Sequence, residues 1–213
     1  MQEIVDSIIQ GRWFTGETAP FKCSLTLDNP RLVIITGPNA CGKSVLRKIL
    51  HNRAAEAKLM YVNTSQEGRV QSSGLERLML YGTETDESTG YNSVKQLTKC
   101  FQSVKSYEKP CVVMLDEPEI GCSEEVQAAI GQRIAQEWSQ PENMPAVRAF
   151  FIITHSRQVV KHALPVKPSH WRLCDDGMTL DQFVNREVVP ANLEQMMADS
   201  KETWHAVNRV MKK

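Results

Sequence analysis

Short apolar runs alternate along the chain with segments whose apolar residues recur every three or four positions. Each run is bounded by polar, glycine or proline residues, which is typical of a strand buried in a sheet. The runs cover residues 21–27, 31–36, 59–62, 111–116 and 150–154. Strands that alternate with helices in this way indicate an α/β fold with a largely parallel sheet.

The segments between the runs have helical periodicity. Residues 44–57 follow the second run, and two later segments each place apolar side chains on one helical face. These faces consist of Val94, Leu97, Phe101 and Val104 in the first segment, and of Val126, Ile130, Ile134 and Trp138 in the second. Residues 140–145 contain two prolines and predict a surface loop, and residues 175–177, Asp-Asp-Gly, predict a turn between two short strand-like runs.

The end of the chain, residues 191–212, is expected to form one helix. Apolar side chains recur there at helical spacing after Pro190. They are Leu193, Met196, Met197, Trp204, Val207 and Met211. Such a stripe usually faces the protein's own core, so we expect this helix to coat the fold. Contact with a partner is the alternative.

The length and the net charge of the chain bear on the number of domains and on nucleic-acid binding. At 213 residues, without a linker or a shift in composition, the chain is expected to fold as a single domain over residues 1–213. Its 25 basic and 25 acidic residues give a net charge of zero. Charge alone therefore does not indicate nucleic-acid binding, although a local basic patch would still allow it.

The sequence predicts a cytoplasmic protein without a membrane segment. No apolar run approaches the roughly 20 residues needed to cross a bilayer. The first residues carry Glu3 and Asp6 instead of a basic secretory leader. The six cysteines form no CxxC pair, and several lie in apolar or loop segments. We therefore expect reduced thiols rather than a disulfide framework.

The strongest chemical motif is Gly-Pro-Asn-Ala-Cys-Gly-Lys-Ser at residues 37–44, which matches the P-loop pattern GxxxxGK[ST] between an apolar run and a helical segment. Its glycines let the backbone N–H groups wrap around a phosphate, and Lys43 adds a cation. The hydroxyl of Ser44 is expected to hold Mg²⁺. The residues expected to bind the nucleotide, ATP, are Asn39, Ala40, Cys41, Gly42, Lys43, Ser44 and Val45. Cys41 is interpreted as a small filler of the loop rather than as a reactive thiol.

A second motif, at residues 111–118, is an apolar strand that ends in two adjacent carboxylates and a proline. Asp116, at the strand end, can hold Mg²⁺ through water. Glu117 is placed to orient or deprotonate the water that attacks the terminal phosphate. An acidic turn without catalytic function is the alternative, but the P-loop upstream favours the catalytic interpretation.

With these two motifs in this order, the chain resembles the nucleotide-binding domain of the ATP-binding-cassette (ABC) superfamily over about residues 21–181. The resemblance implies a P-loop NTPase fold with an ABC-type mixed sheet, and it suggests further catalytic residues. His155, after the run 150–154, is similar to the family's switch histidine near the γ-phosphate. Gln66 has the place of the glutamine that contacts the metal and the attacking water, which makes it a third candidate metal contact beside Ser44 and Asp116.

The family's signature loop, Ser-Gly-Gly at a helix start, contacts the γ-phosphate of the nucleotide bound to the opposite subunit. Ser88, Thr89 and Gly90 match it in order and spacing, with Thr89 in place of the first glycine. Residues 72–74, Ser-Ser-Gly, are a less favoured alternative further upstream.

Two other family positions are ambiguous. Ser123 stands where the family usually has an aspartate that links the paired sites, but a helix N-cap explains it at least as well. Trp13 or Phe14 is in the part of the chain from which the family stacks an aromatic ring on adenine, although anchoring the sheet is favoured for both.

The resemblance implies an ATP-hydrolysing protein whose nucleotide joins two copies until hydrolysis separates them. Only 21 residues separate Gln66 from Ser88, too few for a transporter's helical subdomain, and they contain no heptad run for a coiled-coil arm. We therefore expect a soluble ATPase that drives a nucleic-acid-associated or other partner protein. The alternatives are a nucleotide-gated interaction protein with little turnover and a soluble ATPase subunit of a transporter.

Overall fold

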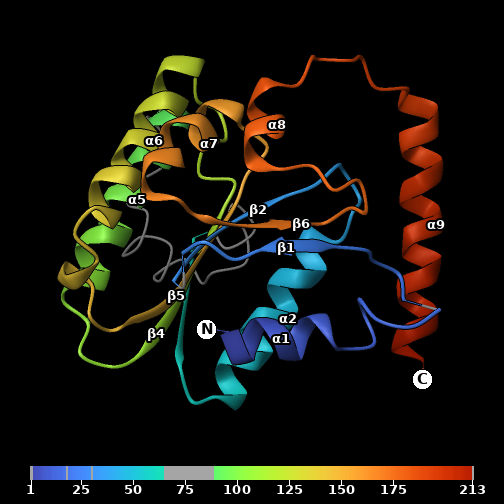
Figure 1. Ribbon diagram of the computed structural model, residues 1–213, viewed down its shortest axis with the longest axis horizontal. Helices are drawn as coiled ribbons and strands as arrows, with labels where there is room; N and C mark the ends of the chain where they lie inside the picture. The colour runs from blue at the N-terminus through green and yellow to red at the C-terminus, as the bar shows by residue number, and fades with distance from the viewer. Residues whose placement is uncertain (1, 18, 30, 65–88, 213) are drawn as a thin grey trace.

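The computed structural model describes residues 2–17, 19–29, 31–64 and 89–212, and these residues form a mixed sheet of six strands (Figure 1). The strand order is β1-β6-β2-β5-β4-β3. β1 runs antiparallel to β6, and the other neighbouring pairs are parallel. The strands are β1 (Ser24–Thr26), β2 (Leu32–Thr36), β3 (Met60–Thr64), β4 (Cys111–Asp116), β5 (Val147–Ile153) and β6 (Ser169–Arg172). The arrangement confirms the expected α/β class.

Helices cover both faces of the sheet because the central strands are apolar on both sides. In β2, Leu32 and Ile34 pack with one group of helices, while Val33 and Ile35 pack with the other. The first group comprises α5 (Thr89–Lys105), α6 (Glu124–Trp138), α7 (Arg157–Ala163) and α8 (Leu180–Asn185), and the second comprises α1 (Gln2–Ile9) and α2 (Lys43–Glu56). Two 3-10 helices, η1 (Pro141–Asn143) and η2 (Leu164–Val166), lie in the connections.

Three parallel strands end side by side at one edge of the sheet, because β5 lies between β2 and β4. The chain leaves these strands at Thr36, Asp116 and Ile153. The P-loop, the acidic pair and the histidine segment each begin at one of these ends. Ligands of open α/β sheets bind at this carboxyl edge, so the topology brings the three candidate segments together.

The observed strand bounds differ from the predicted runs most at the edge strand β1 and at the start of β5, which begins at Val147. β4 has the predicted bounds, whereas the run 21–27 contributes only the three residues of β1. Phe21 is buried outside that strand, and its ring packs against Gly42. The apolar character of Phe21 therefore reflects contact with the P-loop and not with the sheet.

β6 corresponds to the short strand-like run expected before the turn at 175–177, although three of its four residues are polar. These side chains are nevertheless buried, since they find partners inside the protein. His170 Nε2 lies 2.8 Å from Thr36 Oγ1, and Arg172 forms an ion pair of 2.6 Å with Asp176. The turn at 175–177 leads into α8 and not into a strand, so the prediction of a strand after this turn is wrong.

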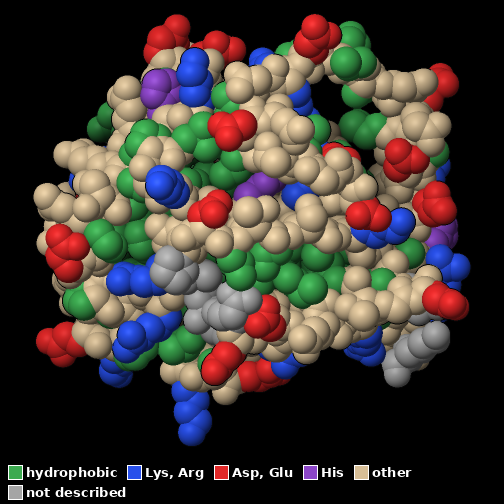
Figure 2. All heavy atoms as spheres, viewed as in Figure 1, with side chains coloured by type: hydrophobic (Ala, Val, Ile, Leu, Met, Phe, Trp, Pro, Cys, Tyr) green, Lys and Arg blue, Asp and Glu red, His purple; other side chains and the backbone are tan. Residues whose placement is uncertain are grey.

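The C-terminal segment forms the expected helix, α9 (Leu193–Met211), but the prediction that its apolar stripe faces the core is mostly wrong. Val207 and Val210 are buried, while other large apolar side chains of α9 are 61–67% exposed. These are Leu193, Met197, Trp204 and Met211. The exposed connection 186–192 leads from α8 to α9, and Figure 2 shows an opening between this end of α9 and the rest of the protein.

The described part of the chain contains no helix that is both long enough and apolar enough to cross a lipid bilayer. All six cysteines carry free thiols, which agrees with the prediction of reduced cysteines.

Candidate functional site

The P-loop connects β2 to α2 through backbone conformations that favour glycine. Gly42 has a φ of 96° and Ala40 a φ of 60°. A Cβ atom at Gly42 would lie 2.3 Å from the ring of Phe21, and one at Gly37 would lie 2.4 Å from Cys41 Sγ. Since α2 begins at Lys43, the free N–H groups of its first turn point into the loop, where they can bind an anion.

Lys43 folds back over this loop. Its Nζ donates hydrogen bonds to the carbonyl oxygens of Pro38, at 2.8 Å, and Gly37, at 3.3 Å. The ammonium group is therefore held at the mouth of the loop, where a phosphate can replace the carbonyl oxygens as its acceptor. Burial raises the pKa of the Cys41 thiol, which supports its interpretation as a filler of the loop.

The two adjacent carboxylates at the end of β4 have different environments. Burial raises the pKa of Asp116, although the guanidinium of Arg47, whose Nε lies 3.6 Å from Asp116 Oδ2, favours the charged form. Glu117 has a φ of 51°, an unusual value for a residue other than glycine. Its N–H donates to Ile153 O at 2.9 Å, so a backbone hydrogen bond to β5 holds it in this conformation.

Glu117 meets His155 across the gap between the ends of β4 and β5. His155 Nε2 lies 3.4 Å from Glu117 Oε1. The hydrogen bond with His155 is the main reason why the pKa of Glu117 is below its ordinary value. Glu117 is therefore a carboxylate at neutral pH, able to accept a hydrogen bond from a water molecule beside it.

Glu119 is a site residue that the sequence analysis misses. It is buried, and its Oε1 accepts three hydrogen bonds from the segment that carries the histidine. The donors are Thr154 Oγ1 at 2.7 Å, His155 N at 2.9 Å and Ser156 N at 3.2 Å. Burial raises the pKa of Glu119 above its ordinary value, and the hydrogen bonds from Thr154 and His155 offset only part of this shift. Glu119 thus ties the loop after β4 to the loop after β5.

The oxygen groups at this edge fit a magnesium ion. Ser44 offers a hydroxyl at the start of α2, and Asp116 offers a carboxylate whose burial raises its pKa. Mg²⁺ prefers such oxygen ligands and usually keeps water and substrate phosphates as the others. A cation beside Asp116 would offset the cost of burying its charge. Ser44 and Asp116 are therefore suited to hold Mg²⁺ together with a phosphate.

A pocket of about 420 Å³ joins the P-loop to the catalytic candidates. Its lining includes six of the P-loop residues predicted to bind the nucleotide, namely Asn39, Ala40, Gly42, Lys43, Ser44 and Val45. It also includes the predicted catalytic residues Glu117 and His155. It also includes residues that the sequence analysis does not assign, namely Phe21, Lys48, Ser200, Thr203, Trp204 and Val207. The apolar stripe of the last helix was the available signal for Trp204 and Val207, but periodicity does not tell which surface a stripe faces.

Other predicted site residues lie elsewhere. Gln66 and Ser88 fall outside the described residues, as does the alternative signature segment 72–74. Thr89 and Gly90 begin α5 and contact the backbone at Gly121, away from the pocket.

The two aromatic residues considered as alternatives for stacking on adenine are not part of the pocket lining either. Trp13 and Phe14 pack on Phe21, with ring centroids 6.5 and 5.8 Å from its own. Phe14 also packs on Trp171 of β6, as expected for an anchor of the sheet. Ser123 occupies the N-cap position of α6, as its structural interpretation requires, but its side chain accepts no capping hydrogen bond.

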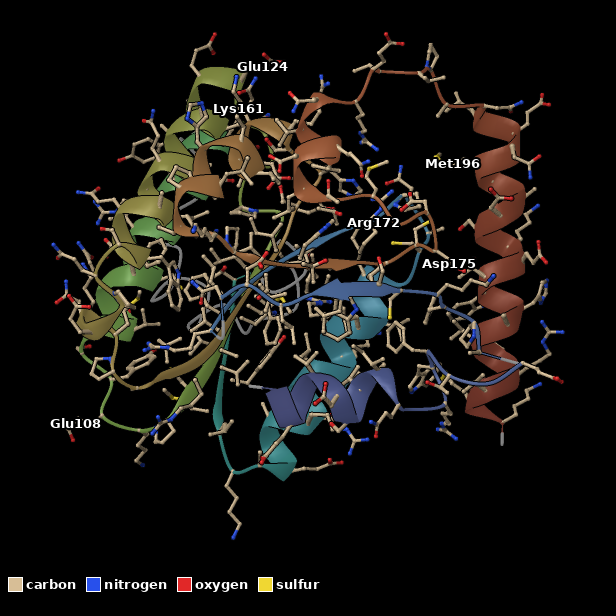
Figure 3. All side chains as sticks on the ribbon, viewed as in Figure 1. Glu108, Glu124, Lys161, Arg172, Asp175 and Met196 are labelled. Atoms are coloured by element: carbon tan, nitrogen blue, oxygen red, sulfur yellow. The ribbon has the colours of Figure 1, made fainter. Side chains whose placement is uncertain are left out.

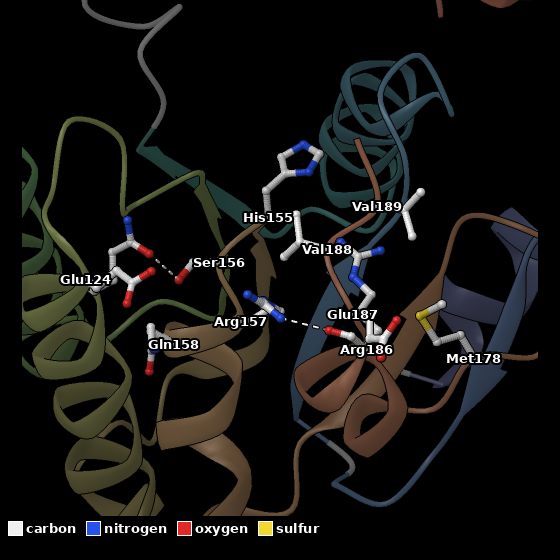
Figure 4. Close-up of a pocket in the computed structure, with 11 residues that line it drawn as sticks. Glu124, His155, Ser156, Arg157, Gln158, Met178, Arg186, Glu187, Val188 and Val189 are labelled. Atoms are coloured by element: carbon white, nitrogen blue, oxygen red, sulfur yellow. Dashed lines mark hydrogen bonds between the residues drawn. The ribbon is translucent and has the colours of Figure 1, made fainter. Parts of the chain in front are cut away.

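A second pocket, of about 540 Å³, lies on the other side of His155 between the starts of α6 and α7 and the connection after α8 (Figure 4). Arg157 donates to Arg186 O at 2.8 Å across it, and Ser156 Oγ donates to Gln127 Oε1 at 2.7 Å. This pocket is the larger of the two, but it contains neither the P-loop nor Glu117. The smaller pocket is therefore the candidate nucleotide site.

No curated protein matches the chain. Matching solved structures include a dimeric bacterial ABC transporter cassette, 14% identical, with 65% of this chain and 80% of that chain covered and a TM-score of 0.36. Another is Cdc6p from Pyrobaculum aerophilum, 16% identical, with 94% of this chain covered and a TM-score of 0.35. The chain spans about half of Cdc6p, since the match covers 48% of that protein.

A family model matches residues 33–166, which is more than half of the chain and extends from β2 to η2. The matched part contains the P-loop, the acidic pair and His155. Together with the mixed sheet, this match establishes a P-loop NTPase fold, and the family implies nucleotide binding. The chain belongs to the ATPase family associated with various cellular activities (AAA).

Proposed function

We propose that this protein binds ATP with Mg²⁺ and hydrolyses its terminal phosphate. The observation that carries the proposal is the convergence of Lys43, Ser44, Glu117 and His155 on one pocket, from three different strand ends. Phosphoryl transfer needs a cationic cradle for the phosphates and a group that positions the attacking water. Residues suited to both roles line this pocket.

Each residue has a distinct role in this proposal. The N–H groups at the start of α2 and the ammonium of Lys43 bind the phosphates, and Ser44 and Asp116 hold Mg²⁺, which when bound supplies positive charge to the phosphate oxygens. Glu117 accepts a hydrogen bond from the attacking water. Because its lowered pKa makes it a weak base, orientation of the water is favoured over early removal of its proton.

His155 contributes to the same step from the neighbouring strand. Its imidazole lies beside the Glu117 carboxylate, and Glu119 holds the His155 backbone through the N–H group. A γ-phosphate between the P-loop and Glu117 would therefore lie within reach of His155. This is the arrangement expected of a switch residue that detects the terminal phosphate.

The features specific to the ABC superfamily belong to the proposal as well. Thr89 is exposed at the start of α5 and lies outside the pocket of its own chain. With Ser88 and Gly90 it would contact the γ-phosphate bound to a second copy, so that ATP joins two copies and hydrolysis releases them. Gln66 is proposed to contact the metal and the attacking water. The effector would be a nucleic-acid-associated or other partner in the cytoplasm.

The test is phosphate release from Mg-ATP by the purified chain, measured beside equilibrium binding of ATP. We expect tight binding and steady turnover that stops when the metal is chelated. Tight binding without turnover, alone and with candidate partners, would favour the alternative of a nucleotide-gated interaction protein. Absence of binding would contradict both.

Glu119→Ala is expected to lower kcat for ATP hydrolysis by about 10- to 100-fold, because small misplacements of catalytic groups have effects of this size. The KM for ATP should change little, since Glu119 lies outside the P-loop pocket. Glu119→Gln keeps an oxygen acceptor and should restore most of kcat. Steady-state kinetics provide the measurement, with Glu124→Ala, at the exposed start of α6, as the control. Equal losses for the Ala and Gln variants, or a loss confined to KM, would exclude this positioning role.

A further inference from the structure

The last helix forms one wall of the P-loop pocket. Ser200, Thr203, Trp204 and Val207 of α9 line the same cavity as Lys43. The helix also contacts the phosphate loop directly, because Asn39 Nδ2 donates to Met196 Sδ at 3.5 Å. Figure 3 shows Met196 on the side of α9 that faces the rest of the protein. α9 is therefore part of the site although it lies beyond the residues that the family model matches.

The two walls of the pocket differ in chemistry. The P-loop and α2 contribute backbone N–H groups, two ammonium groups from Lys43 and Lys48, and a hydroxyl. The wall formed by α9 contributes the indole of Trp204, a valine and the hydroxyls of Ser200 and Thr203. A nucleotide has the complementary division, with an anionic phosphate chain at one end and a flat apolar base with a hydroxylated sugar at the other.

Packing inside the protein does not explain the position of Trp204. Its side chain is 61% exposed, whereas Trp138 and Trp171 are 4% and 0% exposed in the core. An exposed indole on the wall of a pocket offers a face on which a base can stack. Phe21, which also lines the pocket, is only 3% exposed and already packs on Gly42, so Trp204 has the larger free surface.

The backbone that carries Trp204 is anchored on both sides along the helix. Met196 contacts Asn39 two turns before it, and Val207 and Val210 are buried shortly after it. The helix backbone at Trp204 is thus held beside the P-loop, although the connection 186–192 is exposed. Such preorganisation lowers the entropy cost of binding a ligand between the two walls.

We propose that α9 is the nucleoside-binding wall of the site. Trp204 stacks on the purine base, and Ser200 and Thr203 form hydrogen bonds with the ribose hydroxyls. This inference rests on the proposed function, since it needs the phosphates to bind at the P-loop. It assigns recognition of the nucleoside to a helix outside the P-loop and the acidic strand, and it gives the exposed tryptophan a ligand.

The test compares two ligands that share a triphosphate, Mg-ATP and Mg-tripolyphosphate, by titration calorimetry on the full chain. The unmodified protein should bind ATP more tightly. Trp204→Ala should weaken ATP binding by about tenfold, the effect of losing one base–aromatic stack, and leave tripolyphosphate binding within about twofold. Trp204→Phe keeps an aromatic ring and should retain most of the ATP affinity. Met211 is an exposed apolar residue of α9 outside the pocket, so Met211→Ala should leave the affinity for both ligands unchanged.

The outcomes separate this inference from the function on which it rests. Binding of neither ligand by the unmodified protein would contradict the proposed function, and this inference with it. Equal affinity of the unmodified protein for both ligands would overturn the inference alone. If Trp204→Ala weakened the affinity for both ligands equally, α9 would only support the P-loop. If the variant bound ATP more tightly, Trp204 would obstruct the pocket. Either result would also overturn the nucleoside-binding role.

Discussion

Glu117→Gln should lower ATP turnover by about 100- to 10,000-fold, the usual contribution of a positioned acid–base group. The substitution keeps the size of the side chain and removes the charge that lies 3.4 Å from His155 Nε2. ATP binding should persist, because the P-loop and Lys43 are unchanged. Single-turnover hydrolysis and equilibrium binding, measured on the same preparation, would separate the two effects.

Glu108→Gln is the matched control for this variant. Glu108 is exposed and precedes β4 at the end of the strand opposite to the site, so the same change of charge should leave turnover unaltered. The variant also tests the pairing of two copies, since ATP that is not hydrolysed should hold them together. A doubled mass in Mg-ATP would support pairing through Ser88, Thr89 and Gly90. Normal turnover in Glu117→Gln would exclude Glu117 from the reaction.

Lys43→Ala is expected to weaken Mg-ATP binding by roughly 10- to 150-fold, the range for a lost hydrogen bond to a charged group. The loss has two parts. The phosphates lose a cation, and the loop loses the bonds from Nζ to the carbonyl oxygens of Gly37 and Pro38. Turnover should fall at least as far, because the same ammonium would stabilise the charge that builds up on the phosphates.

Titration calorimetry with ATP provides the measurement for this variant, and circular dichroism shows whether the fold persists. Lys109→Ala is the control, because Lys109 is exposed beside Glu108 at the far end of β4. A folded Lys43→Ala variant that binds ATP with unchanged affinity would show that the P-loop match has no nucleotide function here.

The sequence predicts the centre of the fold and of the site well, because the relevant signals are local. The acidic strand has its predicted bounds in β4, and the P-loop lies between β2 and α2 as expected. In the first place an apolar run ends at two adjacent carboxylates, and in the second it ends at a loop with positive φ angles at Ala40 and Gly42. Each short segment therefore specifies both structure and chemistry. His155 follows its strand in the same way, one residue after Thr154.

The remaining parts depend on contacts between distant segments. Glu119 has no recognisable motif, and its function becomes visible only when Thr154 and His155 are found beside it. Ser169 and His170 of β6 are buried because Asn29 and Thr36, from distant parts of the chain, supply their partners. Trp204 belongs to a stripe that periodicity assigns to a helix face, and periodicity cannot distinguish a core from a ligand pocket.

The family match also refines the expectation drawn from the motifs. A P-loop and an acidic strand end are shared by many ATPases, and the match assigns this chain to the AAA family. The features that would distinguish an ABC cassette are the signature loop and Gln66. Thr89 and Gly90 are placed at the start of α5, and Gln66 lies outside the described residues. The mass of Glu117→Gln in Mg-ATP is thus the measurement that bears on this distinction.

The position of β5 between β2 and β4 has a consequence for how the site tolerates mutation. Two inter-strand spacings of about 4.8 Å each separate the strand of the P-loop from the strand of the acidic pair. Main-chain hydrogen bonds of β5 to β2 and to β4 set this width of about 10 Å. Core substitutions in Phe150 or Ile152 can therefore reduce thermal stability while the spacing between phosphate and carboxylate stays constant. The geometry of the reaction should therefore tolerate apolar substitutions in the core that packs on β5.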